Sequence, residues 1–186
     1  MENLKEQRWE YRIWPPEGVP ALDMVSQKGQ IQKSEYRTDT YIITADTDLL
    51  SKLRGNRLFE VKRRCASREG FEQWGISIRS AFPLSPESLN DLPQSLSRPV
   101  GCETPESLER MAVESGALVA SIRKHRRLFD IDTVQAEITE ILGGGLPTLS
   151  IALEGEEFDR TRAVANDLGL TAFPNRDYGA ALRAAA

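Results

Sequence analysis

Charged side chains stand two residues apart at four places in this sequence, each time inside a segment with the composition of a β-strand. The pairs are Glu10 with Arg12, Lys52 with Arg54, Glu60 with Lys62, and Lys124 with Arg126. Residues two apart on a strand share a face, so each pair projects to one side. A sheet with one apolar face and one face bearing both charges predicts a barrel with a wet, charged lumen. Such a lumen suits a small polyanion with a divalent metal, because cations hold phosphate groups and carboxylates hold the metal.

The segments that must position these pairs are rich in β-branched and aromatic residues and alternate in hydropathy. They predict strands over residues 8–14, 36–44, 50–54, 58–64, 71–82, 117–131, 133–141 and 147–154. Gly55-Asn56 and Gly143-Gly144-Gly145 are typical of hairpin turns, and Gly75 is a candidate bulge. A strand follows the three glycines, so they are not expected to cradle a phosphate as a loop before a helix would.

Helix signals lie between and after these strands. Ser85-Pro86 and Thr104-Pro105 each place proline after an N-cap residue, which predicts two helix starts. Residues 155–170 form an amphipathic segment, residues from 175 onward predict a last helix, and residues 19–35 are ambiguous, with a short helix near 21–27 as one option. The order of elements predicts one α+β domain over residues 1–186, an antiparallel β-barrel (tunnel) of about eight strands with helices packed outside.

Composition and charge limit the class of partner. Of the 186 residues, 40% are hydrophobic and 28% are charged, as in an ordinary soluble globular protein, and the net charge is −4. A negative net charge argues against nucleic acid as the partner. Basic residues are nevertheless concentrated at 52–64 and 123–127. Small polyanions are therefore the expected ligands.

Other features bear on localisation and on alternative chemistry. The N-terminus lacks the apolar run of a signal peptide, and no segment reaches the roughly 18 apolar residues that a membrane span needs. Cys65 and Cys102 have no metal-ligand spacing; a disulfide stays open, but two thiols in a chain of this length favour a reduced, cytoplasmic protein. The only histidine, His125, is interpreted as a solvated strand residue rather than a catalytic base.

Several motifs match, in order, those of a known family. Arg8-x-Glu10-x-Arg12 is similar to an opening Glu-x-Glu-x-Lys strand, and Asp39-Thr40-Tyr41 to a second strand with Asp and Tyr. Further matches are Lys52-Leu53-Arg54, Glu60-Val61-Lys62, Lys124-His125-Arg126 with Phe129, Glu137 and Glu140 before Ala152-Leu153-Glu154, Leu168-Gly169-Leu170, and Asp177-Tyr178. On these motifs, which extend over most of the chain, the sequence resembles the CYTH domain, also called the triphosphate tunnel metalloenzyme fold.

The resemblance implies an activity and a set of site residues. Members include inorganic triphosphatases, thiamine triphosphatases and class IV adenylyl cyclases, so it implies Mg²⁺- or Mn²⁺-dependent hydrolysis of a triphosphate or nucleoside triphosphate inside a charged β-tunnel. Catalytic roles then fall on Glu10 and Lys62, and metal ligation on Glu10, Glu137 and Glu154. Phosphate contacts fall on Arg12, Lys52, Arg54, Lys62, Lys124 and Arg126, with Arg79 as a further inward-facing candidate.

Two departures from the family pattern support an alternative. Arg8 stands where the family has its first acid, and Ala152 stands where it has an acid of the last strand. Loss of these acids favours a non-catalytic polyphosphate- or nucleotide-binding module on the same fold. The charged pairs could also be structural salt bridges or a solvated face, and Glu154 could instead serve the N-terminus of the next helix.

The three tryptophans and the possible partners complete the expectations from the sequence. Trp9, Trp14 and Trp74 are interpreted as packing anchors rather than base-stacking platforms. No membrane partner is expected. The organic group of the ligand and the oligomeric state, with a homodimer as one option, are left open by the sequence.

Overall fold

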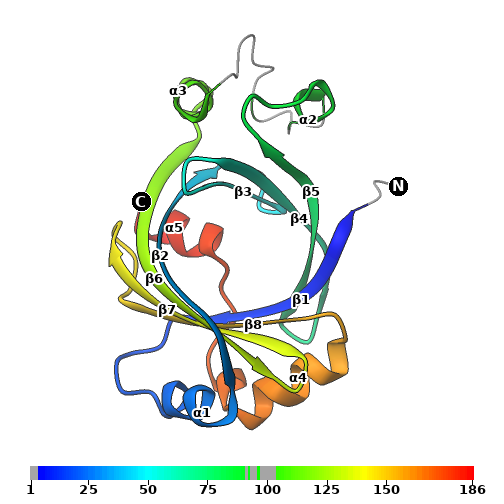
Figure 1. The fold of residues 1–186 in the computed structure, drawn as a ribbon, viewed down its shortest axis with the longest axis vertical. Helices are drawn as coiled ribbons and strands as arrows, with labels where there is room; N and C mark the ends of the chain where they lie inside the picture. The colour runs from blue at the N-terminus through cyan, green and yellow to red at the C-terminus, as the bar shows by residue number, and fades with distance from the viewer. Residues whose placement is uncertain (1–3, 91, 93–95, 97–103) are drawn as a thin grey trace.

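Eight antiparallel strands close into a barrel in the computed structural model, which describes residues 4–90, 92, 96 and 104–186. The order around the barrel is β1-β5-β4-β3-β2-β6-β7-β8, with β8 pairing back onto β1 (Figure 1). The strands are β1 (Lys5–Ile13), β2 (Gln30–Ile43), β3 (Leu49–Arg54), β4 (Leu58–Arg68), β5 (Phe71–Ala81), β6 (Leu118–Ile131), β7 (Val134–Gly143) and β8 (Leu149–Gly155). The predicted fold class, an α+β antiparallel barrel with helices outside, is confirmed.

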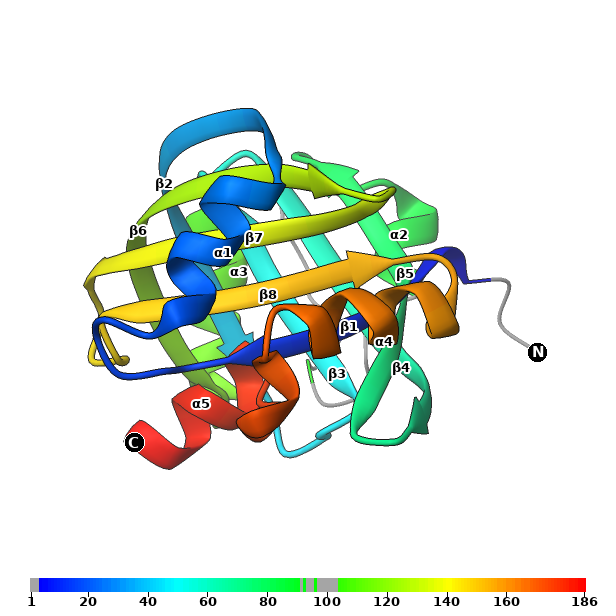
Figure 2. The ribbon, with the colours of Figure 1, turned by 90° about the horizontal axis from the view of Figure 1, so that it is seen from below.

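The helices lie on the outer surface of this barrel. They are α1 (Pro20–Lys28), α2 (Pro86–Asn90), α3 (Pro105–Glu114), α4 (Phe158–Asp167) and α5 (Tyr178–Ala185), with a short 3₁₀ turn at Leu170–Ala172. Figures 1 and 2 show α1 and α4 on the side of β7 and β8, and α2 and α3 on the opposite side. The fifth helix, α5, lies behind the ring of strands in Figure 1, across one end of the barrel.

Most of the apolar core lies between the strands and these helices, and a smaller apolar cluster, which includes Tyr41, Trp74 and Tyr178, lies at the end of the lumen that α5 covers. On β7, Ala136 and Ile138 face outward into the cluster beneath α1 and α4, whereas Glu137 and Thr139 face inward. A second apolar cluster packs α3 against the outer faces of β2 to β5, for example Leu108 against the group that contains Phe59. Because side chains alternate along each strand, an apolar outer face leaves the charged alternate positions to the lumen.

Local signals place most element ends where the sequence predicts them. Thr104 accepts a hydrogen bond from the Ser107 backbone N–H at 3.2 Å, so the predicted N-cap of α3 is confirmed. Gly169 ends α4 with a φ of +70°, in the left-handed region that glycine adopts without strain. Gly155 approaches α4 so closely that a Cβ there would lie 2.2 Å from the Thr161 Oγ1.

Two local predictions are wrong. β2 begins at Gln30 and is 14 residues long, because most of its polar first half pairs with β6, and tertiary pairing overrides weak strand propensity. Gly75 is not the extra residue of a bulge, since it pairs in register with Arg63 of β4. On its other side it lies opposite a register shift between Lys5 and Arg8, where the extra residue belongs to β1. The register shifts instead bypass Cys65 on β4 and Ser77 on β5. Gly75 is needed for a close approach, because a Cβ there would lie 2.7 Å from the Leu4 Cβ.

The structure also bears on the expectations for membrane spans, the two cysteines and His125. None of the helices in the described part of the chain has the length and apolarity needed to cross a membrane. Cys65 is a free thiol, and Cys102 lies outside the described residues. His125 lies on the outer face of β6, where its ring stacks on Tyr36 with centroids 4.3 Å apart, and it does not line the lumen.

Candidate functional site

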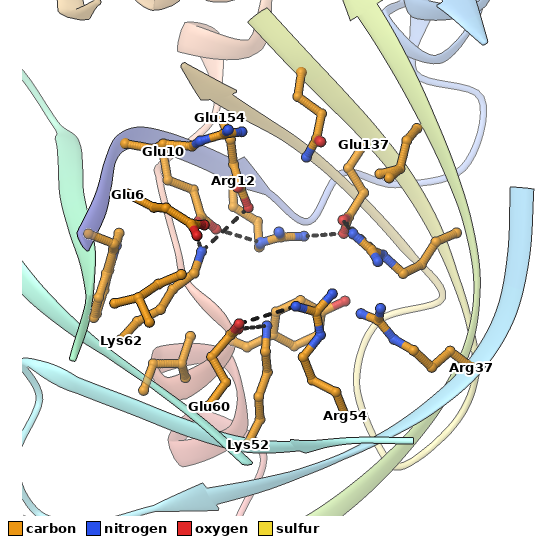
Figure 3. A pocket seen from close by; sticks show the side chains of 18 of the residues that line it. Glu6, Glu10, Arg12, Arg37, Lys52, Arg54, Glu60, Lys62, Glu137 and Glu154 are labelled. Carbon is orange, nitrogen blue, oxygen red and sulfur yellow. Dashed lines mark hydrogen bonds and ion pairs between the residues drawn. The ribbon is translucent and has the colours of Figure 1, made fainter. Parts of the chain in front are cut away.

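A cavity of about 230 Å³ fills the barrel lumen, and charged side chains dominate its wall (Figure 3). Ten cationic side chains line it, namely Arg8, Arg12, Lys33, Arg37, Lys52, Arg54, Lys62, Arg79, Lys124 and Arg126. Six carboxylates accompany them, namely Glu6, Glu10, Glu35, Glu60, Glu137 and Glu154. Behind the wall, the buried Asp39 carboxylate also contacts Lys124 and Arg37. With Asp39 counted, the lumen carries a formal excess of three positive charges, in a chain whose net charge is −4.

Every residue that the sequence singled out for catalysis, phosphate contact or metal ligation lines this cavity. They come from seven of the eight strands: Glu10 and Arg12 from β1, Lys52 and Arg54 from β3, Lys62 from β4, Arg79 from β5, Lys124 and Arg126 from β6, Glu137 from β7 and Glu154 from β8. The structure thus brings the candidates together, while their chemical roles stay predictions.

One side of the lumen, which we call the basic wall, consists of Lys52, Arg54, Arg79 and the carboxylate Glu60, with Glu6 at its edge in contact with Arg79 at 2.8 Å. Glu60 is 1% exposed. It accepts contacts from Lys52 at 3.1 Å, Arg54 at 3.1 Å and Arg79 at 2.9 Å. Burial opposes ionisation of Glu60, but attraction by Lys52, Arg54 and Lys62 outweighs it and lowers its pKa to about 2. Glu60 is therefore an ionised internal counter-ion to three cations.

The opposite side, which we call the mixed wall, consists of Glu10, Arg12, Glu137 and Glu154. Glu10 and Glu154 face each other across the β1–β8 pair. Lys62 reaches across from β4 to both, at 3.4 Å from Glu10 and 3.6 Å from Glu154. Arg12 lies between Glu10 and Glu137, at 3.2 Å from each (Figure 3). In this wall every carboxylate is matched by a cation.

The two departures from the family pattern fall on this mixed wall. Ala152 pairs in register with Arg12 on one side and with Glu137 on the other. Its small side chain leaves room for the Arg12 guanidinium, which also donates to the Ser150 Oγ at 2.9 Å. Arg8, in place of an acid, adds a positive charge to the cavity wall. Both changes replace negative charge at the positions where the family pattern has it.

A divalent metal does not fit this arrangement of carboxylates as it stands. Among the residues that the structure describes, no three His, Cys, Asp or Glu side chains gather as a group that could hold a metal ion. The expected ligands Glu10, Glu137 and Glu154 are instead held by Arg12, by Lys62 and by cations of β6. Hard divalent cations need several carboxylate or carbonyl oxygens converging on one point, and here guanidinium and ammonium groups take those oxygens.

The third part of the wall is formed by β2 and β6. Arg126 donates to Glu35 at 2.9 Å and to Glu137 at 2.9 Å. Burial opposes ionisation of Glu137, but Arg126, Arg12 and Lys124 hold its pKa well below its usual range. This carboxylate, 4% exposed, is thus the ionised centre of the β1–β6–β7 contact.

Lys124 is a lumen cation whose pKa lies close to neutral pH. Its Nζ lies 2.8 Å from the buried carboxylate of Asp39 and 3.1 Å from the Tyr41 hydroxyl, and it sits 4.6 Å from the centroid of the Tyr178 ring. Desolvation outweighs the attraction of Asp39 and lowers the Lys124 pKa to about 7. Its protonation state is therefore set near neutral pH, where a bound anion could change it.

Part of the wall was not predicted as a site. Lys33 and Glu35 lie in the segment interpreted as ambiguous, and Arg37 lies in the strand predicted over residues 36–44, although their spacing of two residues is the same signal that identified the other pairs. Tyr178 on α5 and Trp74 on β5 also line the cavity. Trp74 belongs to an apolar cluster as expected of a packing anchor, but it is part of the lumen too.

Comparison with known proteins establishes the fold. No protein-family model matches the chain, and no curated protein matches it in sequence. A conserved hypothetical protein from Pyrococcus furiosus superposes with a TM-score of 0.60 at 14% identity, over 94% of this chain and 99% of that one. A protein from Pyrococcus horikoshii gives 0.55 at 14% identity, over 87% and 90% of the two chains.

A third structural neighbour connects the barrel to the family resemblance. A putative adenylate cyclase from Vibrio parahaemolyticus superposes with a TM-score of 0.50 at 15% identity, over 96% of this chain and 99% of that one. This neighbour and the closed eight-stranded barrel are consistent with the triphosphate tunnel fold that the motifs suggest. At such identities the similarity shows shared architecture and leaves activity to the site.

Proposed function

We propose that this protein binds a small linear polyanion, a triphosphate or the triphosphate group of a nucleotide, inside the barrel. The observation that carries the proposal is the formal excess of three positive charges around the lumen, with Asp39 counted, within a chain of net charge −4. A barrel interior that served packing alone would be apolar or balanced in charge. An unbalanced cationic interior is stabilised by an anion that enters it.

The types of cation support phosphate as the anionic group. Arg54 contacts Glu60 through Nη1 and can turn further N–H groups of its guanidinium to a phosphoryl group, and Lys52 and Lys62 supply ammonium charges beside it. The Arg79 nitrogens already contact Glu60 and Glu6, so Arg79 adds positive charge to the same side. The cations come from opposite walls of a narrow tunnel, which suits a chain of phosphates better than a single compact ion. The neighbour described as an adenylate cyclase supports the same ligand class.

The ion pairs within the lumen hold these cations in place before a ligand arrives. Glu60 fixes Lys52, Arg54 and Arg79, so little side-chain entropy is lost when a phosphoryl group binds near them. Because cations outnumber carboxylates, a polyanion can share them without leaving a carboxylate unpaired. The site is therefore preorganised rather than self-neutralised.

A thermal-shift titration tests this proposal. Tripolyphosphate, ATP and thiamine phosphates are added to the protein in the presence of EDTA, with sulfate at equal ionic strength as the control. We expect tripolyphosphate to raise the melting temperature in a saturable manner, because a ligand that binds only the folded state stabilises it. Equal small shifts with sulfate and tripolyphosphate would reject a specific polyanion site.

Metal-dependent hydrolysis of the bound triphosphate is the second candidate. The specific observation in its favour is that Glu10 and Glu154 face each other across β1 and β8, with the Lys62 ammonium in contact with both and Arg12 in contact with Glu10. Mg²⁺ or Mn²⁺ would have to replace that ammonium at the pair. Such an ion would supply charge neutralisation of the phosphoryl group, and Lys62 would be left free to contact the ligand.

Phosphate release from tripolyphosphate with and without Mg²⁺ or Mn²⁺ separates the two candidates. If hydrolysis occurs, Glu10→Gln should abolish it while tripolyphosphate still binds, because only the metal-holding charge is lost. Arg8→Glu restores an acid at the cavity wall and should increase metal-dependent turnover. A wild-type protein without turnover, together with an Arg8→Glu variant that gains none, would leave binding as the function.

A further inference from the structure

Two hydrogen-bond donors in the cavity wall have no partner among the described residues. The Tyr178 hydroxyl and the Trp74 Nε1 are both inaccessible to solvent and unbonded. Tyr178 is 4% exposed and Trp74 is 2% exposed, and both residues line the lumen. A buried polar group without a partner has lost its hydrogen bonds to water with no replacement, which destabilises the folded state. Two of them in one cavity wall therefore call for an explanation in terms of something that the cavity receives.

Both residues belong to the end of the tunnel that α5 covers. Tyr178 opens α5 and stacks on Tyr41, with ring centroids 4.7 Å apart. Trp74 shares an apolar cluster with these two residues and with Leu182 of α5. The arginines of the basic wall, by contrast, come from the ends of β3 and β5 away from α5. A ligand that enters past those arginines would meet Tyr178 and Trp74 last.

The chemistry of this covered end selects the group that can occupy it. The two unpartnered groups are an O–H and an N–H, so both can donate. Burial keeps the Tyr178 pKa raised, which preserves its proton. The Arg12 guanidinium carbon lies 4.7 Å above the Tyr178 ring and the Lys124 Nζ lies 4.6 Å from it, so the surroundings are cationic. An anionic acceptor without donors of its own matches this end, whereas a base or an amine does not.

We propose that Tyr178 and Trp74 form a subsite for the free terminal phosphoryl group of the polyanion. This inference rests on the proposed function and adds an orientation to it. The unesterified end of the phosphate chain lies at the end covered by α5, and any organic group lies toward the basic wall and the opposite opening. The two donors would then act as specificity-determining residues that discriminate a free phosphoryl end from an esterified one.

Tyr178→Phe is the decisive variant because it removes only the hydroxyl. The ligand-free protein should melt at the same or a higher temperature, since an unsatisfied buried donor is lost. Affinity for tripolyphosphate should fall about tenfold or more, the range of a hydrogen bond to a charged acceptor. A purely structural role for the hydroxyl would lower stability and leave affinity unchanged.

Tyr11→Phe is the matched control. Tyr11 is also a buried tyrosine, but its hydroxyl donates to the Phe173 carbonyl at 2.7 Å on the outside of the barrel. This variant should lose stability and keep its affinity for tripolyphosphate, the reverse of Tyr178→Phe. Trp74→Phe, which leaves a space in the core, is compared by affinity rather than by melting temperature and should also bind more weakly.

Esterified ligands test the orientation directly. Wild-type protein should bind ATP, which has one free end, at least tenfold more tightly than diadenosine triphosphate, in which both ends are esterified. That preference should shrink in Tyr178→Phe. If wild type binds tripolyphosphate and both Tyr178→Phe and Trp74→Phe bind it equally well, the donors serve water only, and this inference falls while the proposed function stands. If wild type binds no polyanion, both fall.

Discussion

The basic wall and the mixed wall are built from the same kind of sequence signal, yet they differ in how charge is distributed. In the basic wall Glu60 contacts three cations, and Glu6 contacts one of them, Arg79. In the mixed wall Arg12 contacts Glu10 and Glu137, Lys62 contacts Glu10 and Glu154, and Arg126 contacts Glu137. The basic wall has more cations than carboxylates, whereas in the mixed wall each carboxylate contacts a cation.

The difference indicates which part of the lumen recruits a ligand. Phosphate oxygens gain most where cations exceed carboxylates, so the basic wall is the expected point of attraction. The mixed wall is where the family pattern has its metal-site acids, and here Arg8 and Ala152 have reduced its negative charge. The proposed phosphate site therefore depends on the basic wall and not on the acids that the resembled pattern has at the positions of Arg8 and Ala152.

The largest expected effect is on stability, from the mixed wall. Glu137→Gln leaves Arg12 and Arg126 buried without their shared carboxylate, and breaking a buried pair in this way costs about 3–5 kcal/mol. Urea unfolding monitored by circular dichroism measures it. Glu140→Gln, on the outer face of the same strand, is the control and should cost about 1 kcal/mol or less. Equal losses in both variants would contradict the central role of Glu137.

The next effect concerns ligand affinity. Lys62→Ala and Arg126→Ala should each weaken tripolyphosphate binding by about 1–3 kcal/mol, the range of a hydrogen bond to a charged group. Isothermal titration calorimetry measures it. Arg127→Ala is a matched control for Arg126, because Arg127 is the next residue of β6 and points outward, where it contacts Glu140. Affinity that is unchanged in both lumen variants would place these cations outside the binding site.

A change of opposite sign is expected in the basic wall. Glu60→Gln removes the internal counter-ion of Lys52, Arg54 and Arg79, so the ligand-free protein should become less stable. Tripolyphosphate should bind about tenfold more tightly, because phosphate then replaces the missing negative charge. Combined chemical denaturation and calorimetry resolve the two effects. Weaker binding would mean instead that Glu60 is needed mainly to orient the three cations.

The smallest effect is a pH dependence that involves Lys124. Its pKa of about 7 in the ligand-free protein should rise when a polyanion binds, since negative charge favours the protonated form. Binding near and above pH 7 should then take up a proton, and affinity should fall by at most tenfold per pH unit as pH rises through this range.

Calorimetry in two buffers with different ionisation enthalpies measures that proton uptake. Lys124→Met is the control, because the titration of tripolyphosphate itself contributes equally to both proteins. Uptake that is as large in Lys124→Met as in wild type would assign the proton to the ligand alone.

The sequence predicted most of this site because its signal is local. A charged residue every second position inside a strand-like segment predicts a charged face without knowledge of the neighbouring strands, and Glu10, Lys62 and Arg126 were found in this way. The Lys33–Arg37 segment carries the same pattern but has weak strand propensity, and pairing with β6 gives it its strand conformation. Tyr178 and Trp74 carry no spacing signal, because they enter the lumen from a helix and from an aromatic cluster.

By itself the sequence determined that this is an antiparallel barrel with helices outside and a charged lumen, because the side-chain period of a strand fixes which residues share a face. Only the tertiary structure decided which charges meet. The pairing of β1 with β8 and of β6 with β7 brings Glu10 opposite Glu154 and places Arg12 and Arg126 on Glu137. Electrostatic function depends on distances between strands far apart in the chain, and those distances follow from the closure of the barrel and the packing of α5 across its end.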